Sequence, residues 1–304
     1  MPAKPKISVV IPVHNEQDDV AELTHRLTEV LGPDDEIIFV DDGSSDATWQ
    51  RLEKLHQPGR VRLVKFRTNF GKAAALMAGF ALTRGELVFT MDGDLQDDPS
   101  EIPRFIERLD EGFDLVSGWK KTRHDPINKD IASRIFNSCV RRLTRVNLHD
   151  MNCGFKCYRG DLARSVRIYG ELHRFIPALV AHGGYRVGEI EVRHQARQHG
   201  RSKYGFSRLF KGFFDLITVL LKTRFADRPS HGFGFVAMGC GLTGLALLVG
   251  QVVFPSIAVI GGLALFLGLS AVILLSAGCV AEIAVANSPN GKVTPWFDVE
   301  ETRD

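Results

Sequence analysis

Short apolar runs alternate with helical patterns along the N-terminal part of the chain, and this alternation limits the possible folds more than any other feature. The apolar runs occupy residues 7–11, 36–40, 61–66 and 87–91, with helical patterns at 18–31, 48–55 and 73–83. This β-α-β-α succession predicts an α/β fold with a mostly parallel sheet, covered by helices and joined by right-handed crossovers. Two further runs at 113–118 and 187–192 extend the predicted sheet.

The fourth apolar run ends abruptly in acidic residues. Asp92 and Asp94 follow it at once, separated by a glycine, and Gln96 comes next. Because ligands of open α/β sheets bind at the carboxyl ends of the strands, these side chains are expected at a binding edge. Two carboxylates and an amide oxygen suit Mg²⁺ or Mn²⁺ holding a diphosphate. The alternative is a solvated acidic turn in which Pro99 opens the next helix.

Polar residues also follow two earlier strands. They are Pro12, Asn15 and Glu16 after the first strand, and Asp41 and Asp42 after the second. One or two such groups would be explained as caps of the following helices. Three polar strand ends together, with Lys72 at a helix start, predict a nucleoside diphosphate site. The sequence has neither a Walker-type loop nor G-x-G-x-x-G after its first strand, so a metal and basic side chains are expected to hold the pyrophosphate.

Length, net charge and cysteine content limit the classes of protein to which the chain can belong. The 304 residues suffice for one large domain and an additional segment, and the formal net charge of +2 gives no strong attraction to nucleic acid. The five cysteines are an odd number, and two lie in an apolar tract, so we expect a reducing compartment without a disulfide framework. Cys153 and Cys157 lack a second pair, which makes zinc the minority interpretation. The N-terminus leads directly into a strand, so no signal peptide is expected.

A long uncharged tract near the C-terminus predicts two transmembrane helices. Residues 232–281 contain no Asp, Glu, Lys or Arg, and Pro255 lies where the tract divides. Each part exceeds the ~20 apolar residues needed to cross a bilayer, and we place the spans at 233–254 and 257–281. The alternative is a buried hairpin in a soluble core, which the uncharged length and the glycine content disfavour.

Basic residues near the tract predict contact with the membrane surface. Basic amphipathic helices are predicted at 128–145 and 207–224 and are typical of membrane surfaces; the alternative for the first is a core-facing helix with a solvated basic face. Lys222, Arg224 and Arg228 precede the first span, so the positive-inside rule places the α/β domain and the C-terminus in the cytoplasm. The predicted divisions are an α/β domain at 1–206, a juxtamembrane helix at 207–231, a two-helix hairpin at 232–283 and a tail at 284–304.

Four segments resemble the successive signatures of family 2 glycosyltransferases, which have the GT-A fold. They are Pro-Val-His-Asn-Glu at 12–16, Val-Asp-Asp-Gly-Ser-Ser-Asp at 40–46, Asn-Phe-Gly-Lys at 69–72 and Asp-Gly-Asp-Leu-Gln at 92–96. They occur in the order and at the spacing of the family. Within it, the chain is similar to the dolichol-phosphate mannose synthase group, whose bacterial relatives load undecaprenyl phosphate with a single sugar.

The resemblance implies roles for individual residues. Asp92, Asp94 and Gln96 would hold Mg²⁺ or Mn²⁺ on the donor diphosphate. The residues implied in nucleotide-sugar binding are Pro12, Asn15, Glu16, Asp41, Asp42 and Lys72. Residues 150–156 resemble the D-x-x-x-G-F-K/R segment of the family, which makes Asp150 a catalytic candidate beside Asp92 and Asp94. The alternative is that Asp150 only orients a loop.

A basic loop at 197–205 resembles the R-x-x-G-x-S-K loop that covers the donor in the polyprenyl-phosphate group. The matching residues Arg201, Ser202 and Lys203 would bind phosphates, since Arg binds them bidentately and Lys supplies a point charge. The alternative is an exposed basic turn. Arg123 and Arg134 are the expected ligands of the acceptor phosphate, which arrives at the plane of the membrane.

The resemblance implies a membrane enzyme that transfers one sugar, with inversion, from a nucleoside diphosphate sugar to a polyprenyl phosphate. UDP-glucose and GDP-mannose are the expected donors, a modified arabinose donor stays open, and homo-oligomers are expected. The sequence lacks the Q-x-x-R-W element of processive synthases, which favours single transfer. The rival hypotheses are a transferase for another lipid or lipid-linked glycan, and a non-catalytic membrane partner that keeps the nucleotide fold.

Overall fold

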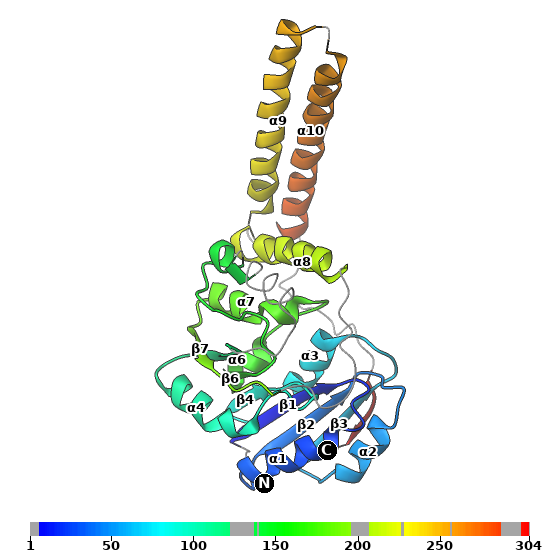
Figure 1. Cartoon of the computed structure of the whole chain (residues 1–304), viewed down its shortest axis with the longest axis vertical. Helices are drawn as coiled ribbons and strands as arrows, with labels where there is room; N and C mark the ends of the chain where they lie inside the picture. The colour runs from blue at the N-terminus through cyan, green and yellow to red at the C-terminus, as the bar shows by residue number, and fades with distance from the viewer. Residues whose placement is uncertain are drawn as a thin grey trace. The chain divides into compact units, whose positions relative to one another are not determined.

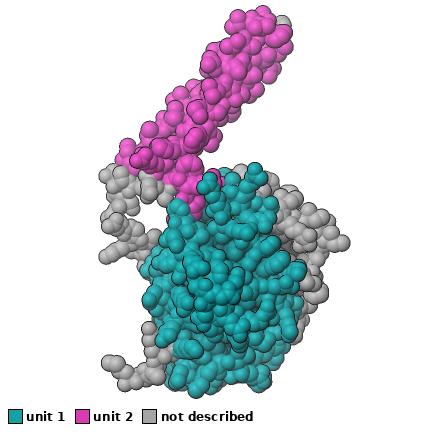
Figure 2. Space-filling view, turned by 90° about the vertical axis from the view of Figure 1, so that its left-hand side faces the viewer, with its two compact units in different colours: residues 1–219, 294–304 teal, residues 220–293 magenta. Residues whose placement is uncertain are grey.

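The computed structural model (Figure 1) describes residues 6–121, 137–138, 140–195, 207–225, 228–255, 257–286 and 299–303. It has two compact units, one of residues 1–219 with 294–304 and one of residues 220–293 (Figure 2). The expected site residues Arg123, Arg134, Arg201, Ser202 and Lys203 lie outside the described residues. Of the predicted helix at 128–145, residues 137–138 and 140–145 are described; residues 137–138 and 140–144 are helical, and Arg145, with φ 61°, is not.

An eight-stranded sheet organises the first unit, in the order β7-β5-β6-β4-β1-β2-β3-β8 (Figure 1). Its strands are β1 (Ile7–Val13), β2 (Glu36–Asp41), β3 (Val61–Phe66), β4 (Leu87–Thr90), β5 (Leu115–Trp119), β6 (Lys156–Arg159), β7 (Val187–Glu191) and β8 (Val299–Arg303). β1 pairs in parallel with β2 and β4, β2 pairs in parallel with β3, and β5 pairs in parallel with β7. The predicted mostly parallel α/β sheet is therefore confirmed.

Helices cover both faces of this sheet. They are α1 (Val20–Val30), α2 (Thr48–Leu55), α3 (Lys72–Leu82), η1 (Pro99–Glu101), α4 (Ile102–Asp110), α6 (Gly160–Ser165), η2 (Leu172–Phe175) and α7 (Ile176–His182). The predicted helix at 207–224 is α8 (Ser207–Arg224). β1 contributes Val9 and Ile11 to a buried cluster that includes Leu23 of α1. On the other face α3 packs closely, since a Cβ on Gly79 would lie 2.3 Å from Val10 Cγ1. Burial on both faces explains why the strand sequences are continuous apolar runs.

Two antiparallel strands, β6 and β8, are not predicted by the sequence pattern. β6 lies between β4 and β5 and runs antiparallel to both. Its residues Lys-Cys-Tyr-Arg form no apolar run, and they become buried because neighbouring strands flank them. β8 pairs antiparallel with β3 at the edge of the sheet, so part of the C-terminal segment, expected only as a tail, joins the first unit. Its charged sequence is typical of an edge strand.

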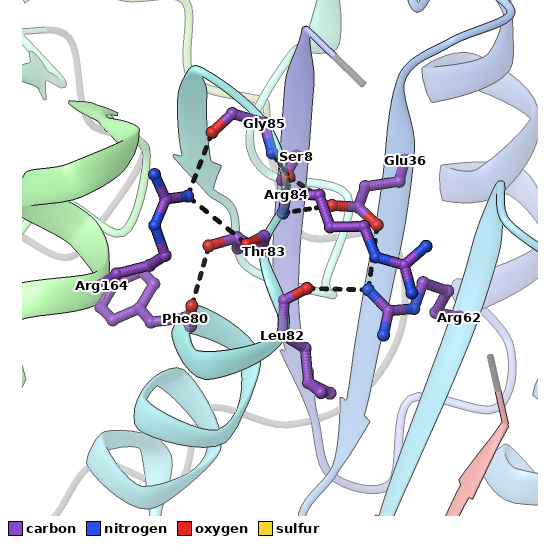
Figure 3. Close-up of polar contacts among 9 residues, drawn as sticks. All are labelled: Ser8, Glu36, Arg62, Phe80, Leu82, Thr83, Arg84, Gly85 and Arg164. Atoms are coloured by element: carbon purple, nitrogen blue, oxygen red, sulfur yellow. Dashed lines mark hydrogen bonds and ion pairs between the residues drawn. The ribbon is translucent and has the colours of Figure 1, made fainter. Parts of the chain in front are cut away.

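A buried polar network fixes the amino-terminal ends of β1, β2 and β3 (Figure 3). Ser8 Oγ donates to Glu36 Oε1 at 2.6 Å and accepts the Gly85 N–H at 2.8 Å. Glu36 also accepts the Arg84 N–H at 2.8 Å and a hydrogen bond from Arg62 Nη1 at 3.1 Å. Both charged side chains are almost completely buried, so each needs the other for charge compensation. The network ties the turn before β4 to β1 and β2.

Replacing Ser8 with alanine is expected to lower the free energy of unfolding by about 1–3 kcal/mol, because the buried Gly85 N–H loses its acceptor. Urea unfolding of the protein in detergent micelles measures the change. Ser100→Ala, at an exposed serine, serves as the control and should change stability by less than about 0.5 kcal/mol. Equal stabilities of the two variants would contradict this role of Ser8.

The second unit contains two long apolar helices, α9 (Pro229–Val253) and α10 (Ala258–Ala286). Both are long and apolar enough to cross a membrane, and only 11% and 17% of their apolar windows are buried. A hairpin in the core of a soluble protein would bury most of this surface. The two helices cover the predicted spans at 233–254 and 257–281 except for residues 254 and 257, and they extend beyond them at residues 229–232 and 282–286. They indicate that the chain is anchored in a membrane.

Small residues let α9 and α10 approach closely. A Cβ on Gly244 would lie 3.1 Å from the Ala264 carbonyl oxygen. Near the turn of the hairpin, Gln251 Oε1 accepts the Gly261 N–H at 2.7 Å. Close backbone approach at small residues is typical of helix pairs in membranes.

Replacing Gly244 with leucine is expected to destabilise the hairpin by about 1–3 kcal/mol, because the added side chain overfills the helix contact. The melting temperature of the protein in detergent measures the effect. Gly250→Leu is the matched control, since a Cβ there meets no atom within 4 Å. The same melting temperature for both leucine variants would show that this contact does not hold the helices together.

Candidate active site

The carboxyl ends of neighbouring parallel strands bring the predicted polar residues to one edge of the sheet. The register pairs Val13 at the end of β1 with Asp41 at the end of β2. β4 lies on the other side of β1 and ends two residues before Asp92. The strand order β4-β1-β2 therefore places Asp92, Asn15 and Asp41 along the same edge. This is where open α/β sheets bind ligands.

The loop after β1 is bonded to the loop after β2. Asn15 has a left-handed backbone with φ 58°, which asparagine adopts more readily than most residues. Its N–H donates to Ser44 Oγ at 2.9 Å, and its Oδ1 accepts the Ser45 N–H at 2.8 Å. Pro12 lies within β1, and both Pro12 and Glu16 are half-buried. The two bonds of Asn15 hold the loop after β1 to the loop after β2.

Asp41 is a buried carboxyl group with one oxygen unused. Its Oδ1 accepts hydrogen bonds from the Ser44 hydroxyl at 2.5 Å and from the Ser44 N–H at 3.0 Å. Its Oδ2 is buried and has no hydrogen-bond partner among the residues that the structure describes. Burial raises the pKa of this carboxyl above its ordinary value, although the bonds from Ser44 oppose the rise. A buried acceptor without a partner is uncommon, which makes Oδ2 a candidate contact for a ligand.

Asp42 holds the loop that leads into α3. Its carboxylate accepts the Phe70 N–H at 2.7 Å and the Gly71 N–H at 2.9 Å. Gly43, with φ 66°, permits the close approach of the two loops, since a Cβ there would lie 2.5 Å from the Thr68 carbonyl carbon. The sequence predicts Asp42 in a nucleoside pocket. In the structure its two oxygens accept backbone N–H groups, so Asp42 holds this loop.

Lys72 and Asp92 form an ion pair at the centre of the site. Lys72 is the first residue of α3, and its Nζ contacts Asp92 Oδ1. Burial would raise the pKa of the Asp92 carboxyl, but the ammonium groups of Lys72 and Lys120 hold it well below its ordinary value. Burial would likewise lower the pKa of Lys72, but Asp92 raises it above its ordinary value. Both groups are therefore charged at neutral pH.

Asp94 and Gln96 lie in the turn after Asp92. The Gln96 N–H donates to Asp94 Oδ1 at 3.3 Å, and Leu95 between them has φ 60°. The Gln96 carbonyl oxygen accepts the Gln195 N–H at 3.0 Å. This bond attaches Gln195, which precedes the basic loop at 197–205 in the sequence, to the turn at residues 92–96.

The three predicted metal ligands fit a metal that is shared with a substrate. Asp92, Asp94 and Gln96 offer hard oxygen donors, and Mg²⁺ is usually bound by one or two carboxylates together with substrate phosphates. Across the described ranges, no three His, Cys, Asp or Glu side chains are grouped to hold a metal alone. Burial raises the pKa of the Cys153 thiol to about 12.

A second ion pair, between Lys120 and Asp97, supports the Asp92 turn. Lys120 Nζ lies 2.7 Å from Asp97 Oδ1, and Asp97 Oδ2 accepts the Asp92 N–H at 3.4 Å. Burial would lower the pKa of Lys120, but Asp97 keeps it above its ordinary value. Sequence reasoning missed this pair. The available signal was a lysine directly after β5, at the same edge of the sheet as the acidic run.

Asp150 begins a turn that packs against Asp92. Its Oδ1 accepts the Asn152 N–H at 3.2 Å, a bond typical of aspartates that orient loops. Gly154 in the same turn is so close to Asp92 that a Cβ would lie 2.5 Å from Asp92 Oδ2. The Gly154 carbonyl oxygen accepts a hydrogen bond from Thr90 Oγ1 at 2.8 Å. These contacts support the loop-orienting interpretation of Asp150.

The carboxyl edge of the sheet gathers charged Asp and Lys side chains, and comparison with known proteins gives the family. The model of glycosyl transferase family 2 matches residues 8–166, and the chain belongs to this family. The resemblance of the four sequence segments is therefore confirmed.

Two curated relatives are similar along most of the chain. A dodecaprenyl-phosphate galacturonate synthase of Rhizobium johnstonii is 42% identical over 253 residues, which cover 80% of this chain and 74% of the relative. An undecaprenyl-phosphate 4-deoxy-4-formamido-L-arabinose transferase of Edwardsiella ictaluri is 37% identical over 265 residues, which cover 86% of this chain and 82% of the relative. The chain is thus a glycosyltransferase enzyme related to these proteins.

Solved structures confirm the GT-A fold. Glucosyl-3-phosphoglycerate synthase from Mycobacterium tuberculosis, in complex with phosphoglyceric acid, matches with a TM-score of 0.57 at 22% identity, covering 73% of this chain and 80% of that chain. A complex of that enzyme with Mn²⁺, UDP-glucose and phosphoglyceric acid matches with a TM-score of 0.56 at 20% identity and the same coverage, 73% and 80%. At these identities the likeness concerns the fold alone.

Proposed function

We propose that this enzyme transfers one sugar from a nucleoside diphosphate sugar to a polyprenyl phosphate at a membrane. The observation that carries the proposal is the similarity to two curated relatives that are both named for a polyprenyl phosphate. Two helices long enough to cross a membrane support it, because a polyprenyl acceptor is itself confined to the bilayer.

The donor nucleoside is proposed to bind over β1 and β2. Asp41 Oδ2, which has no hydrogen-bond partner among the described residues, suits an N–H group of the base, since a buried acceptor without a partner gains most from a ligand donor. Pro12, Asn15 and Glu16 would line the pocket, and Asp42 would shape it through the loop that it holds. The residues proposed for the phosphates are Lys72, Arg201, Ser202 and Lys203.

The donor diphosphate is proposed to share a Mg²⁺ or Mn²⁺ ion with Asp92, Asp94 and Gln96. When bound, the metal neutralises charge that develops on the leaving diphosphate. Lys72, which contacts Asp92 in the structure, is then available to the phosphates. EDTA is expected to abolish transfer, and added Mg²⁺ or Mn²⁺ is expected to restore it; full activity in EDTA would exclude this role of the metal.

The proposed reaction is a single displacement at the anomeric carbon. An acceptor phosphate oxygen forms a bond to this carbon while the bond to the donor diphosphate breaks, and the diphosphate leaves with both bonding electrons. Attack from the opposite face inverts the configuration. A phosphate monoester, with a second pKa of about 6, is largely ionised near neutral pH, so the attacking oxygen needs no strong base. Asp150 then serves by holding its turn.

The sequence and the relatives suggest different transferred sugars. The sequence suggests UDP-glucose or GDP-mannose, whereas the relatives are named for galacturonate and 4-deoxy-4-formamido-L-arabinose. We therefore propose a uronate or a modified arabinose as the transferred sugar. Membranes containing the protein are incubated with undecaprenyl phosphate and these four nucleotide sugars in labelled form, and lipid extracts are separated by thin-layer chromatography. Label in a prenyl phosphate band is expected with one donor, and its absence with every donor would contradict the proposal.

The same assay separates the rival functions. Label on ceramide or on a lipid-linked glycan would identify another acceptor, and a non-catalytic partner would give no labelled lipid. The cytoplasmic orientation of the catalytic unit and the C-terminus is proposed from Lys222, Arg224 and Arg228. Arg123 and Arg134 stay predicted ligands of the acceptor phosphate, and homo-oligomer formation stays a prediction that mass photometry in detergent tests.

A further inference from the structure

Lys156 is a buried ammonium group with few partners. It begins β6, is 3% exposed, and within the described residues its Nζ has one hydrogen-bond acceptor, the Cys153 carbonyl oxygen. An ammonium carries three N–H donors, and burying its charge is costly. Burial lowers the pKa of Lys156 below its ordinary value, although the charges of Asp150 and Asp92 oppose this fall. An anion that reaches this group would stabilise its charged form.

Lys156 lies across Asp92 from the nucleotide side of the site. In the sheet it pairs with Thr90, two residues before Asp92, and Gly154 in the preceding turn packs against the Asp92 carboxylate. β6 and β1 flank β4 on opposite sides. The residues proposed for the nucleoside follow β1 and β2, so an anion bound by Lys156 would approach Asp92 from the other side.

His173 supplies a second unsatisfied group. Its Nδ1 is buried and has no hydrogen-bond partner in the described part of the chain. It belongs to η2, which packs against α3, the helix that begins with Lys72. Burial, together with Lys72, Arg174 and Lys156, holds the pKa of His173 well below its ordinary value. The ring is therefore neutral at pH 7, and its Nδ1 can carry a hydrogen that it donates.

We propose that Lys156 and His173 bind the phosphate group of the lipid acceptor and present one of its oxygens to the donor sugar. This inference rests on the proposed function. An inverting displacement requires the attacking oxygen on the face opposite the leaving diphosphate, and Lys156 lies on the side of Asp92 opposite the nucleotide loops. A phosphate monoester offers several anionic oxygens, so the Lys156 ammonium and His173 Nδ1–H can each donate to one of them.

Kinetics of matched variants test this assignment. Lys156→Met removes the charge at similar volume and is expected to raise the KM for undecaprenyl phosphate about 10- to 100-fold, with the donor KM changed less than twofold. Lys156→Arg keeps a donor cation and should restore most of the affinity. His173→Phe should raise the acceptor KM about fivefold to tenfold, whereas His173→Asn, which keeps an N–H close to the Nδ1 position, should raise it less.

The controls are changes of the same chemistry at exposed sites. Lys54→Met on α2 and His25→Phe on α1 remove a lysine and a histidine from the exposed surface, and both should keep the wild-type acceptor KM. An unchanged acceptor KM in Lys156→Met and His173→Phe would overturn the inference. A raised donor KM with an unchanged acceptor KM would also overturn it, because the bound anion would then belong to the donor.

A binding measurement separates this inference from the proposed function. Undecaprenyl phosphate and undecaprenol are titrated into full-length protein in detergent, and the wild type is expected to prefer the phosphate about tenfold or more. Lys156→Met should lose this preference, and an unaltered preference would overturn the inference. A wild type that makes no labelled lipid would instead overturn the proposed function. Should Lys156→Met unfold, His173→Phe and His173→Asn decide the matter, since the first removes the ring N–H and the second keeps an N–H near its position.

Discussion

Replacing Asp94 with asparagine is expected to lower the rate of sugar transfer by about 100- to 1,000-fold, with stability unchanged. Asparagine keeps the Oδ1 that accepts the Gln96 N–H, so the turn keeps its shape. It removes one of the two carboxylate charges proposed to hold the metal on the donor diphosphate. Rates are measured at saturating donor and acceptor over a range of Mn²⁺ concentrations, and high Mn²⁺ should recover part of the loss.

Asp98→Asn is the matched control for this change. Asp98 lies in the same acidic run, and its carboxylate accepts the Ser100 N–H at 3.0 Å at the start of η1. The Asp98→Asn variant loses the same charge close to the site but keeps every proposed metal ligand. Its transfer rate should therefore stay within about threefold of wild type, since substitutions away from such groups usually have small effects. Wild-type turnover by Asp94→Asn, or equal losses in both variants, would show that a specific carboxylate at position 94 is not required.

Replacing Gly154 with alanine is expected to reduce turnover about 100-fold, although the change adds a single methyl group. The new Cβ would lie 2.5 Å from Asp92 Oδ2, too close for a real contact, so Asp92 or the turn must move. Displacing a reacting or metal-binding group by about 1 Å can cost about 100-fold in rate. The apparent affinity for Mn²⁺ should fall as well, because Asp92 is a proposed ligand.

Gly32→Ala tests whether a glycine-to-alanine change alone has this effect. A Cβ on Gly32 would lie 3.4 Å from Asp35 Oδ2, an ordinary contact distance, so its turnover should match wild type. Circular dichroism and melting temperature verify that both alanine variants are folded. A folded Gly154→Ala protein with wild-type turnover would mean that the position of Asp92 does not limit catalysis.

The parallel half of the sheet could be predicted because its signals are local. Each strand of this half is a buried apolar run, and the next helix follows within a short loop. β6 could not be predicted in this way, since the residues from Lys156 to Arg159 carry two charges and no apolar periodicity. Its burial depends on β4 and β5, which pair with it from distant parts of the sequence. The pairing of β8 with β3 depends on a free sheet edge, which no local pattern reveals.

The site shows the same limit. The approach of Lys72 to Asp92 follows from two strand ends on one edge and could be predicted from the sequence. The hydrogen bonds from the Phe70 and Gly71 N–H groups to Asp42 could not be predicted, because backbone donors carry no residue-specific signal. Lys156 looks in the sequence like the end of a family segment, and its significance comes from its burial in β6, a strand that the pattern does not predict.

The most direct test of a polyprenyl-phosphate glycosyltransferase is the mass of the lipid product. Purified full-length protein is incubated with the active nucleotide sugar and either undecaprenyl phosphate or undecaprenol, and the lipids are analysed by mass spectrometry. The proposed function predicts undecaprenyl phosphate carrying one added sugar residue, nucleoside diphosphate released in equal amount, and unchanged undecaprenol. Sugar added to undecaprenol, or undecaprenyl phosphate left unmodified with every donor, would contradict it.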